Sequence, residues 1–144
     1  MSLKSTYLQA YNLISLTLWS LLLILTPLAS FLYSPTQLYN HLLPLLLPTQ
    51  SLAVLEIIHA SLGLIRASPL TTALQVIGKN LVVWTVMRPF PELMKNTKLG
   101  LAGFAGCLVA WSVSEVLRFG YFVVLGSRGE VSAGLKWLRY VLRC

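Results

Sequence analysis

Long runs of apolar residues constrain this chain more than any other feature of its sequence. The first run, from Leu13 to Tyr33, carries no charge. At about 21 residues it is long enough for a helix to cross a hydrocarbon core of ~30 Å. Only 10% of all residues are charged and 56% are hydrophobic, whereas a soluble domain usually has about 25% charged residues. Because so little polar surface could not cover a soluble fold, the sequence predicts an integral membrane protein.

The order of the apolar runs predicts a single all-α membrane domain over residues 1–144. Four transmembrane helices and an unfinished fifth are expected, at residues 13–33, 51–66, 70–87, 99–125 and 133–144. Pro44 and Pro48 predict that residues 41–48 are a kinked or irregular entry to the second helix. The fifth segment, of ~12 residues, would extend only ~18 Å and could not cross a membrane.

The flanks of the runs indicate a topology. The first run is longer than the about 7–15 residues of a signal-peptide core, so we interpret it as a retained helix. The loop after it has no Lys or Arg, which predicts a lumenal loop and a cytosolic amino terminus. The loop after the third helix carries Arg88, Lys95 and Lys98 and would be lumenal too, against the usual excess of cations on the cytosolic side.

The net charge of +7 does not predict nucleic-acid binding, because Lys and Arg stand singly near the ends of the apolar runs. Cations at such places set topology and face anionic membrane lipid. Cys107 lies inside an apolar run and Cys144 is the last residue, a spacing without a disulfide framework, zinc site or prenylation motif. The sequence has no aspartate, phosphate-binding glycine loop or metal-ligand cluster, so neither a metal nor a cofactor is predicted.

Polar residues interrupt three of the predicted helices at helical spacing. The three sets are Glu56, His59, Gly63 and Arg66; Thr71, Gln75 and Lys79; and Trp111, Glu115, Arg118 and Phe122. Charges at membrane depth normally face a bundle interior or a cavity, so these faces could line a tunnel for a polar head group. Alternatively, Glu115 and Arg118 at i, i+3 only hold the bundle together. For His59, an interhelical hydrogen bond is favoured over catalysis.

One apparent motif is rejected. His59, Ala60 and Arg66 have the spacing of the phosphatase signature His-Cys-x5-Arg, in which the cysteine is the nucleophile. Ala60 stands at the place of that cysteine. The segment therefore has no nucleophile, and phosphatase activity is excluded.

Several segments along nearly the whole chain occur together in one known family. They are residues 7–12 with Trp19, residues 55–63, Ser68, Thr71-Thr72, Gln75-Val76 and Leu138-Arg139-Tyr140. The most specific is Trp111-Ser112-x-x-Glu115-Val116-x-Arg118-Phe119-x-x-Phe122. These segments resemble the 3-hydroxyacyl-CoA dehydratases of fatty-acid elongation, which have Trp-Ser-x-x-Glu-(Ile/Val)-x-Arg-Tyr at that place and were once described as protein tyrosine phosphatase-like.

The resemblance implies a six-helix protein of the endoplasmic reticulum membrane with both ends in the cytosol. It also implies the third step of very-long-chain elongation, loss of water from a (3R)-3-hydroxyacyl-CoA to give the trans-2-enoyl-CoA, with other elongase subunits as partners. The residues then expected to line the site are Glu56, Lys79, Glu115, Arg118, Arg139 and Tyr140. Lys79 and Phe119 replace the Arg and Tyr usual in the family, which removes a bidentate contact and a hydroxyl.

No catalytic residue can be assigned within this sequence. Dehydration needs a base for the C2 proton and an acid for the C3 hydroxyl. The family supplies a Tyr and a Glu seven residues apart in Tyr-Pro-x-Gly-x-x-x-Glu, which would lie beyond Cys144. We therefore expect a carboxyl-terminally truncated family member that is inactive, or nearly so, by itself.

Two other classes of function remain open. The chain could be a non-catalytic membrane scaffold that binds elongase subunits, which requires the four-helix portion to be stable and to associate with them. It could also be a small transporter or proton relay that uses Glu56, Lys79, Glu115 and Arg118. Intramembrane charges alone do not distinguish these functions, because many membrane proteins share them.

Overall fold

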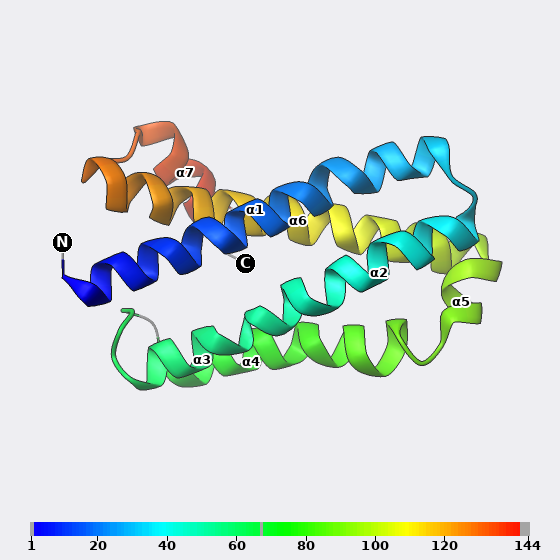
Figure 1. The fold of residues 1–144 in the computed structure, drawn as a ribbon, viewed down its shortest axis with the longest axis horizontal. Coiled ribbons are helices and arrows are strands. Elements are labelled where there is room, and N and C mark those ends of the chain that lie inside the picture. Colours follow the sequence, from blue (N-terminus) through cyan, green and yellow to red (C-terminus); the bar gives the residue numbers. More distant parts are fainter. Residues whose placement is uncertain (1, 67, 142–144) are drawn as a thin grey trace.

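The computed structural model describes residues 2–66 and 68–141, and no side chain is described for Pro35 or Arg139. This part of the chain consists of helices joined by short turns, bends and irregular stretches, and it has no strand. The elements are α1 (Leu3–Leu32), α2 (Pro35–Leu52), α3 (Val54–Ser61), α4 (Pro69–Leu81), the π-helix η1 (Val82–Met87), α5 (Pro91–Asn96), α6 (Lys98–Arg128) and α7 (Ala133–Val141) (Figure 1).

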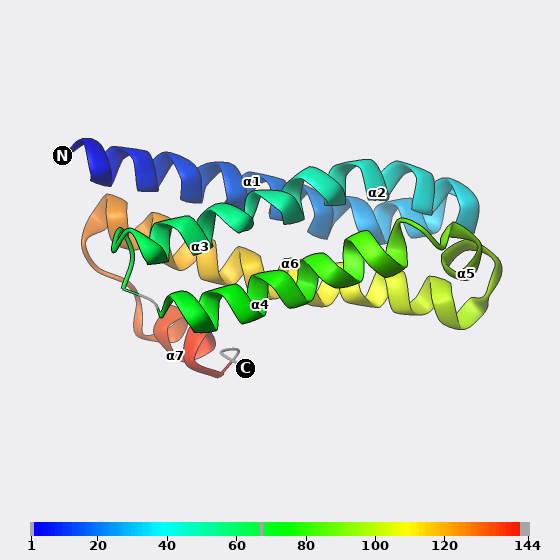
Figure 2. The same cartoon turned by 90° about the horizontal axis from the view of Figure 1, so that it is seen from below.

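The long helices run up and down in an elongated bundle (Figures 1 and 2). Helix α1 runs away from the amino-terminal end of the bundle, α2 and α3 return to it, α4 and η1 run away again, and α6 returns. Helix α1 packs mainly along α6 and also against α2, while α3 packs against α4. The most deeply buried side chains join α1, α2 and α6: Leu22, Leu42, Leu46, Phe104 and Leu108.

Four helical stretches are long and apolar enough to cross a membrane: Leu3–Leu32, Thr36–Ser61, Pro69–Met87 and Lys98–Arg128. They carry many large apolar side chains on the outer surface, such as Ile24 and Leu74, which are 63% and 67% exposed. Such a surface requires an apolar surrounding. The protein is therefore an all-α, multi-pass membrane protein, as the sequence predicts.

The first helix is longer than its apolar run. It begins at Leu3, ten residues before the predicted start at Leu13. The hydroxyl of Ser2 accepts a hydrogen bond from the Ser5 backbone N–H at 3.2 Å, which caps the helix. The additional turns carry Tyr7 and Tyr11, whose hydroxyl groups contact His59 and the Leu52 carbonyl.

The prediction for residues 41–48 allowed a kinked or an irregular entry, and the irregular alternative is wrong, because α2 is helical from Pro35 to Leu52. Ser34 and Gln37 form a capping box that starts this helix. Each internal proline lacks one N–H donor, so Pro44 and Pro48 leave single carbonyl groups unpaired without interrupting the rest of the ladder. Membrane helices tolerate this where neighbouring groups compensate.

The second predicted helix ends earlier than expected. Helix α3 ends at Ser61, and Gly63 has a left-handed backbone conformation with φ of +71°, which glycine adopts without the strain that a Cβ atom would add. Gly63 and Arg66 therefore do not share a helical face with Glu56 and His59, contrary to the prediction.

The third span ends at Met87 as predicted, but its last six residues form a π-helix. The wide π-turn leaves backbone groups for other partners, and the Tyr39 hydroxyl donates a hydrogen bond to the Met87 carbonyl. The following loop, which carries Arg88, Lys95 and Lys98, contains the short helix α5. Pro91 starts this short helix, and Met94 is buried in the core. Helix α6 continues to Arg128, three residues further than predicted, and ends at Gly129.

A close contact between α5 and α6 yields a test of the fold. A Cβ atom at Gly100 would lie 1.9 Å from the Leu93 carbonyl oxygen, whereas one at Gly103 would meet nothing within 4 Å. We expect Gly100→Ala to destabilise the protein by about 1–3 kcal/mol through overpacking. Gly103→Ala is the matched control and should be neutral or stabilising by up to ~1 kcal/mol, because alanine favours helix. Thermal unfolding in detergent would measure both, and equal melting temperatures would contradict the described contact.

Candidate functional site

Four charged side chains from three helices form a connected network, called here the ion-pair cluster: Glu56, Lys79, Glu115 and Arg118. The Arg118 guanidinium binds Glu56 through two contacts, Nη1 to Oε2 at 2.5 Å and Nη2 to Oε1 at 2.8 Å. The same guanidinium contacts Oε2 of Glu115 through Nε at 2.9 Å and also through Nη2. Lys79 Nζ lies 2.5 Å from Oε1 of Glu115. Arg118 therefore links two carboxylates, and Lys79 completes the chain of charges.

Every carboxylate oxygen in the cluster accepts a hydrogen bond. All four carboxylate oxygens of Glu56 and Glu115 accept at least one hydrogen bond from Arg118 or Lys79. Both glutamates are 6% exposed, so these contacts offset the loss of water around the charges. The two cations are more open, since the side chains of Arg118 and Lys79 are 35% and 29% exposed. Two negative and two positive charges make the cluster neutral.

Local helix geometry explains only part of this arrangement. Glu115 and Arg118 are three residues apart on α6, which places both on one face. Glu56 lies on α3 and Lys79 on α4, 62 and 36 residues away from their respective partners. The cluster therefore joins α3 and α4 to α6. Its side chains are the main link between α4 and α6, because the backbones of these two helices come close at few points.

A layer of aromatic side chains adjoins the cluster on the α1 side. The hydroxyl of Tyr7 is 2.8 Å from Nε2 of His59, and the rings of Tyr7 and Tyr11 both meet the His59 ring edge-on. The Tyr11 hydroxyl donates to the Leu52 carbonyl at 3.1 Å. Phe119 packs edge-on against Tyr11 and lies under the Arg118 guanidinium at 4.4 Å. His59 thus forms the interhelical hydrogen bond that the sequence favours.

Three buried side-chain oxygen atoms lack a hydrogen-bond partner within the described residues. They are Oε1 of Gln50, Oγ of Ser51 and Oγ of Ser112. Ser112 is fully buried and lies three residues before Glu115 on the same helix. Buried polar atoms in native proteins are nearly always paired, often by water. Each of these oxygens would therefore stabilise a water molecule or a polar ligand atom placed beside it.

The structure brings together four of the six residues predicted to line a site. Glu56, Lys79, Glu115 and Arg118 meet in the cluster. Tyr140 lies on α7 and is 79% exposed, so it is not part of the buried network. Arg139 has a described backbone in α7, but its side chain lies outside the described part of the structure.

Sequence reasoning missed Tyr7 and Tyr11 as parts of the site. Both lie before the apolar run that the prediction treated as the first helix. Two tyrosines four residues apart share one face of a helix, and their rings and hydroxyl groups can both pack and form hydrogen bonds. This pattern could have predicted them as parts of the site. Two other predicted polar residues, Thr71 and Gln75, are exposed on the outer face of α4.

The arrangement suits binding and orientation better than proton transfer. Every oxygen of the two glutamates already accepts a hydrogen bond from Arg118 or Lys79, so a substrate proton would have to compete with these contacts. The cations, by contrast, reach the surface and can donate to a carbonyl or phosphate oxygen. Among the described residues, no group of three or more His, Cys, Asp or Glu side chains could hold a metal ion.

Comparison with known proteins identifies the family. The sequence profile described as "Protein tyrosine phosphatase-like protein, PTPLA" matches residues 50–144, about two-thirds of the chain. The chain belongs to this PTPLA family. The matched region contains the whole ion-pair cluster.

Curated relatives carry a consistent name. A protein of Schizosaccharomyces pombe named "Probable very-long-chain (3R)-3-hydroxyacyl-CoA dehydratase" is 34% identical over 96% of this chain and 64% of its own length. Very-long-chain (3R)-3-hydroxyacyl-CoA dehydratases of Caenorhabditis elegans and Arabidopsis thaliana are 37% and 31% identical, over 95% of this chain and 61% and 60% of their own. The chain thus spans about three-fifths of the length of these relatives. No solved structure matches it significantly.

The central role of Arg118 in this PTPLA-family chain can be tested. Arg118→Gln would leave two buried carboxylates without their shared cation, and we expect destabilisation of about 3 kcal/mol. Arg128→Gln is the matched control, since Arg128 is exposed at the end of the same helix, and it should change stability by less than about 0.5 kcal/mol. Thermal unfolding in detergent would compare the variants.

A double-mutant cycle would test whether Glu56 and Arg118 stabilise the protein through their mutual contact. Glu56→Gln should be much less harmful in the Arg118→Gln background than in the native chain, because its partner is already absent. Strictly additive effects would show that Glu56 and Arg118 do not stabilise the bundle together.

Proposed function

We propose that this chain acts in the dehydration of (3R)-3-hydroxyacyl-CoA to trans-2-enoyl-CoA during very-long-chain fatty-acid elongation. The observation that carries the proposal is membership of the PTPLA family together with relatives of 31–37% identity that bear the dehydratase name. The ion-pair cluster supports it, because a buried set of charges in an apolar bundle suits a substrate with a polar thioester and a long apolar chain.

In this proposal the cluster holds and orients the substrate. The Arg118 guanidinium has five N–H groups, of which four donate to Glu56 and Glu115. The partly exposed side chains of Arg118 and Lys79 are therefore the available donors for the thioester carbonyl. A donor at that oxygen stabilises the negative charge that develops when the C2 proton leaves.

The cellular setting is also part of the proposal. The four spans support a multi-pass membrane location, and we place the protein in the endoplasmic reticulum membrane because the proposed reaction belongs to fatty-acid elongation there. The other elongase subunits are then the expected partners. Recovery of elongation enzymes with the chain from membranes would support this association. Acyl-CoA binding would favour participation in the reaction over a purely structural scaffold.

Substrate binding is the direct test. The 144-residue chain in lipid nanodiscs would be titrated with a long-chain (3R)-3-hydroxyacyl-CoA, its (3S) enantiomer and the free 3-hydroxy acid. We expect the (3R) thioester to bind most tightly, because the thioester carbonyl and the C3 hydroxyl are recognised together. Lys79→Met should weaken binding several-fold, since one partly exposed charged donor contributes about 1 kcal/mol.

Mass spectrometry of the same samples would follow formation of trans-2-enoyl-CoA. Lys95→Met is the control variant, because Lys95 lies on α5 over the Tyr39 ring and outside the cluster. A chain that binds none of the three ligands would contradict the proposed function. Equal binding of the two enantiomers would contradict the proposed orientation by the cluster.

A further inference from the structure

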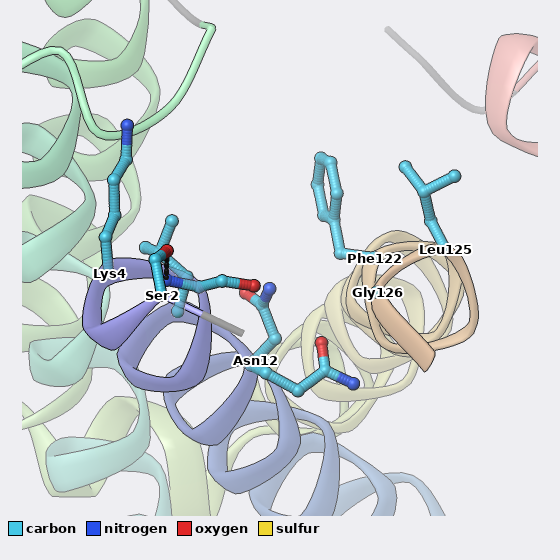
Figure 3. Close-up of a pocket in the computed structure, with 9 residues that line it drawn as sticks. Ser2, Lys4, Asn12, Phe122, Leu125 and Gly126 are labelled. Atoms are coloured by element: carbon cyan, nitrogen blue, oxygen red, sulfur yellow. Dashed lines mark hydrogen bonds between the residues drawn. The ribbon is translucent and has the colours of Figure 1, made fainter. Parts of the chain in front are cut away.

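A second feature lies at the amino-terminal end of the bundle, where α1 and the last turns of α6 diverge. An open pocket of about 380 Å³ is lined from α1 by Lys4, Leu8 and Asn12, and from α6 by Phe122, Leu125 and Gly126. Figure 3 shows Lys4 and Phe122 extending toward the same side from the two helices, with open space between them. The walls thus combine a cation, amide and hydroxyl groups, and apolar side chains.

The pocket continues the polar face of α6 away from the ion-pair cluster. Phe122 is four residues beyond Arg118, one helical turn or ~6 Å along the axis. On α1, Leu8 and Asn12 lie at the same level along the helix as Tyr7 and Tyr11, which contact His59 beside the cluster, but their side chains point about 100° away from those of the tyrosines. The pocket and the cluster are thus about one helical turn apart along α6.

Hydrogen bonds between α1 and α6 hold one side of the pocket in place. Nε2 of Gln9 donates to the Val123 carbonyl at 3.0 Å and to the Ser127 hydroxyl at 2.9 Å, which fastens α1 to the end of α6. A Cβ atom at Gly126 would lie 2.3 Å from Oε1 of Gln9. The glycine therefore permits the side chain of Gln9 to cross between the helices and form one wall.

We propose that this pocket binds the coenzyme A end of an acyl-CoA, with the thioester directed along α6 toward Arg118. Lys4 supplies the cation for a phosphate group, while Asn12 and the nearby serine hydroxyls match the amides of the pantetheine arm. Phe122 supplies an aromatic surface for the apolar parts of the ligand. This inference rests on the proposed function, because it names where the polar part of that substrate lies.

The test uses coenzyme A itself, without an acyl chain, and the complete 144-residue chain in nanodiscs. We expect Lys4→Glu to raise the Kd for coenzyme A about fivefold, the scale of one exposed charge contact, and Asn12→Leu to weaken binding as well. Lys136→Glu is the matched control, because Lys136 is exposed on α7 and does not line the pocket; it should leave the Kd unchanged. An azido-adenine analogue of coenzyme A should label peptides from residues 2–12 and 122–126.

The outcomes separate the two proposals. Selective loss of affinity in Lys4→Glu together with labelling of the pocket would support the inference. Equal weakening by Lys4→Glu and Lys136→Glu would indicate only unspecific attraction of charge and overturn it. Labelling elsewhere, with unchanged affinity for the hydroxyacyl-CoA, would overturn the inference and leave the proposed function standing. If neither coenzyme A nor the hydroxyacyl-CoA binds the native chain, both proposals fail.

Discussion

The charge compensation of Glu56 and Glu115 is the interaction on which the rest of this structure depends. A carboxylate inside an apolar bundle loses its water, and its charge persists only where cations and N–H donors replace that water. Arg118 meets this need for both glutamates, and Lys79 adds to it. Since the four residues come from α3, α4 and α6, satisfying them fixes how these helices stand relative to one another.

The same compensation restricts the chemistry of the site. Carboxylate oxygens that already accept hydrogen bonds from a guanidinium or ammonium group are held in place, and a proton transferred to them would have to compete with these contacts. The open parts of the cluster are its cations, and the unpaired oxygens of Gln50, Ser51 and Ser112 lie in the same interior. A site of this kind offers hydrogen-bond donors inside an apolar bundle, which is the property on which the proposed function rests.

Local signals predicted the fold well where one physical effect dominates. Runs of apolar residues predicted four membrane spans, the number found among the described residues, because length and hydrophobicity are sufficient to reveal a span. The second span, Thr36–Ser61, nevertheless begins fifteen residues before the predicted start at Ser51. Prediction failed where local and tertiary effects compete. Pro44 and Pro48 suggested a break, yet a capped and packed helix accommodates them; Gly63 seemed to continue a helical face, yet its backbone turns left-handed.

The sequence by itself determined that this chain is an all-α membrane protein and that Glu115 and Arg118 share a helical face, since periodicity and hydropathy are local properties. It also named Glu56 and Lys79 as candidates, because charges in a membrane helix must turn inward. Only the tertiary structure decided that Arg118 bridges two carboxylates and that Tyr7 binds His59, while Tyr140 stays exposed. Those pairings depend on the relative height and rotation of helices far apart in the chain, which no local spacing encodes.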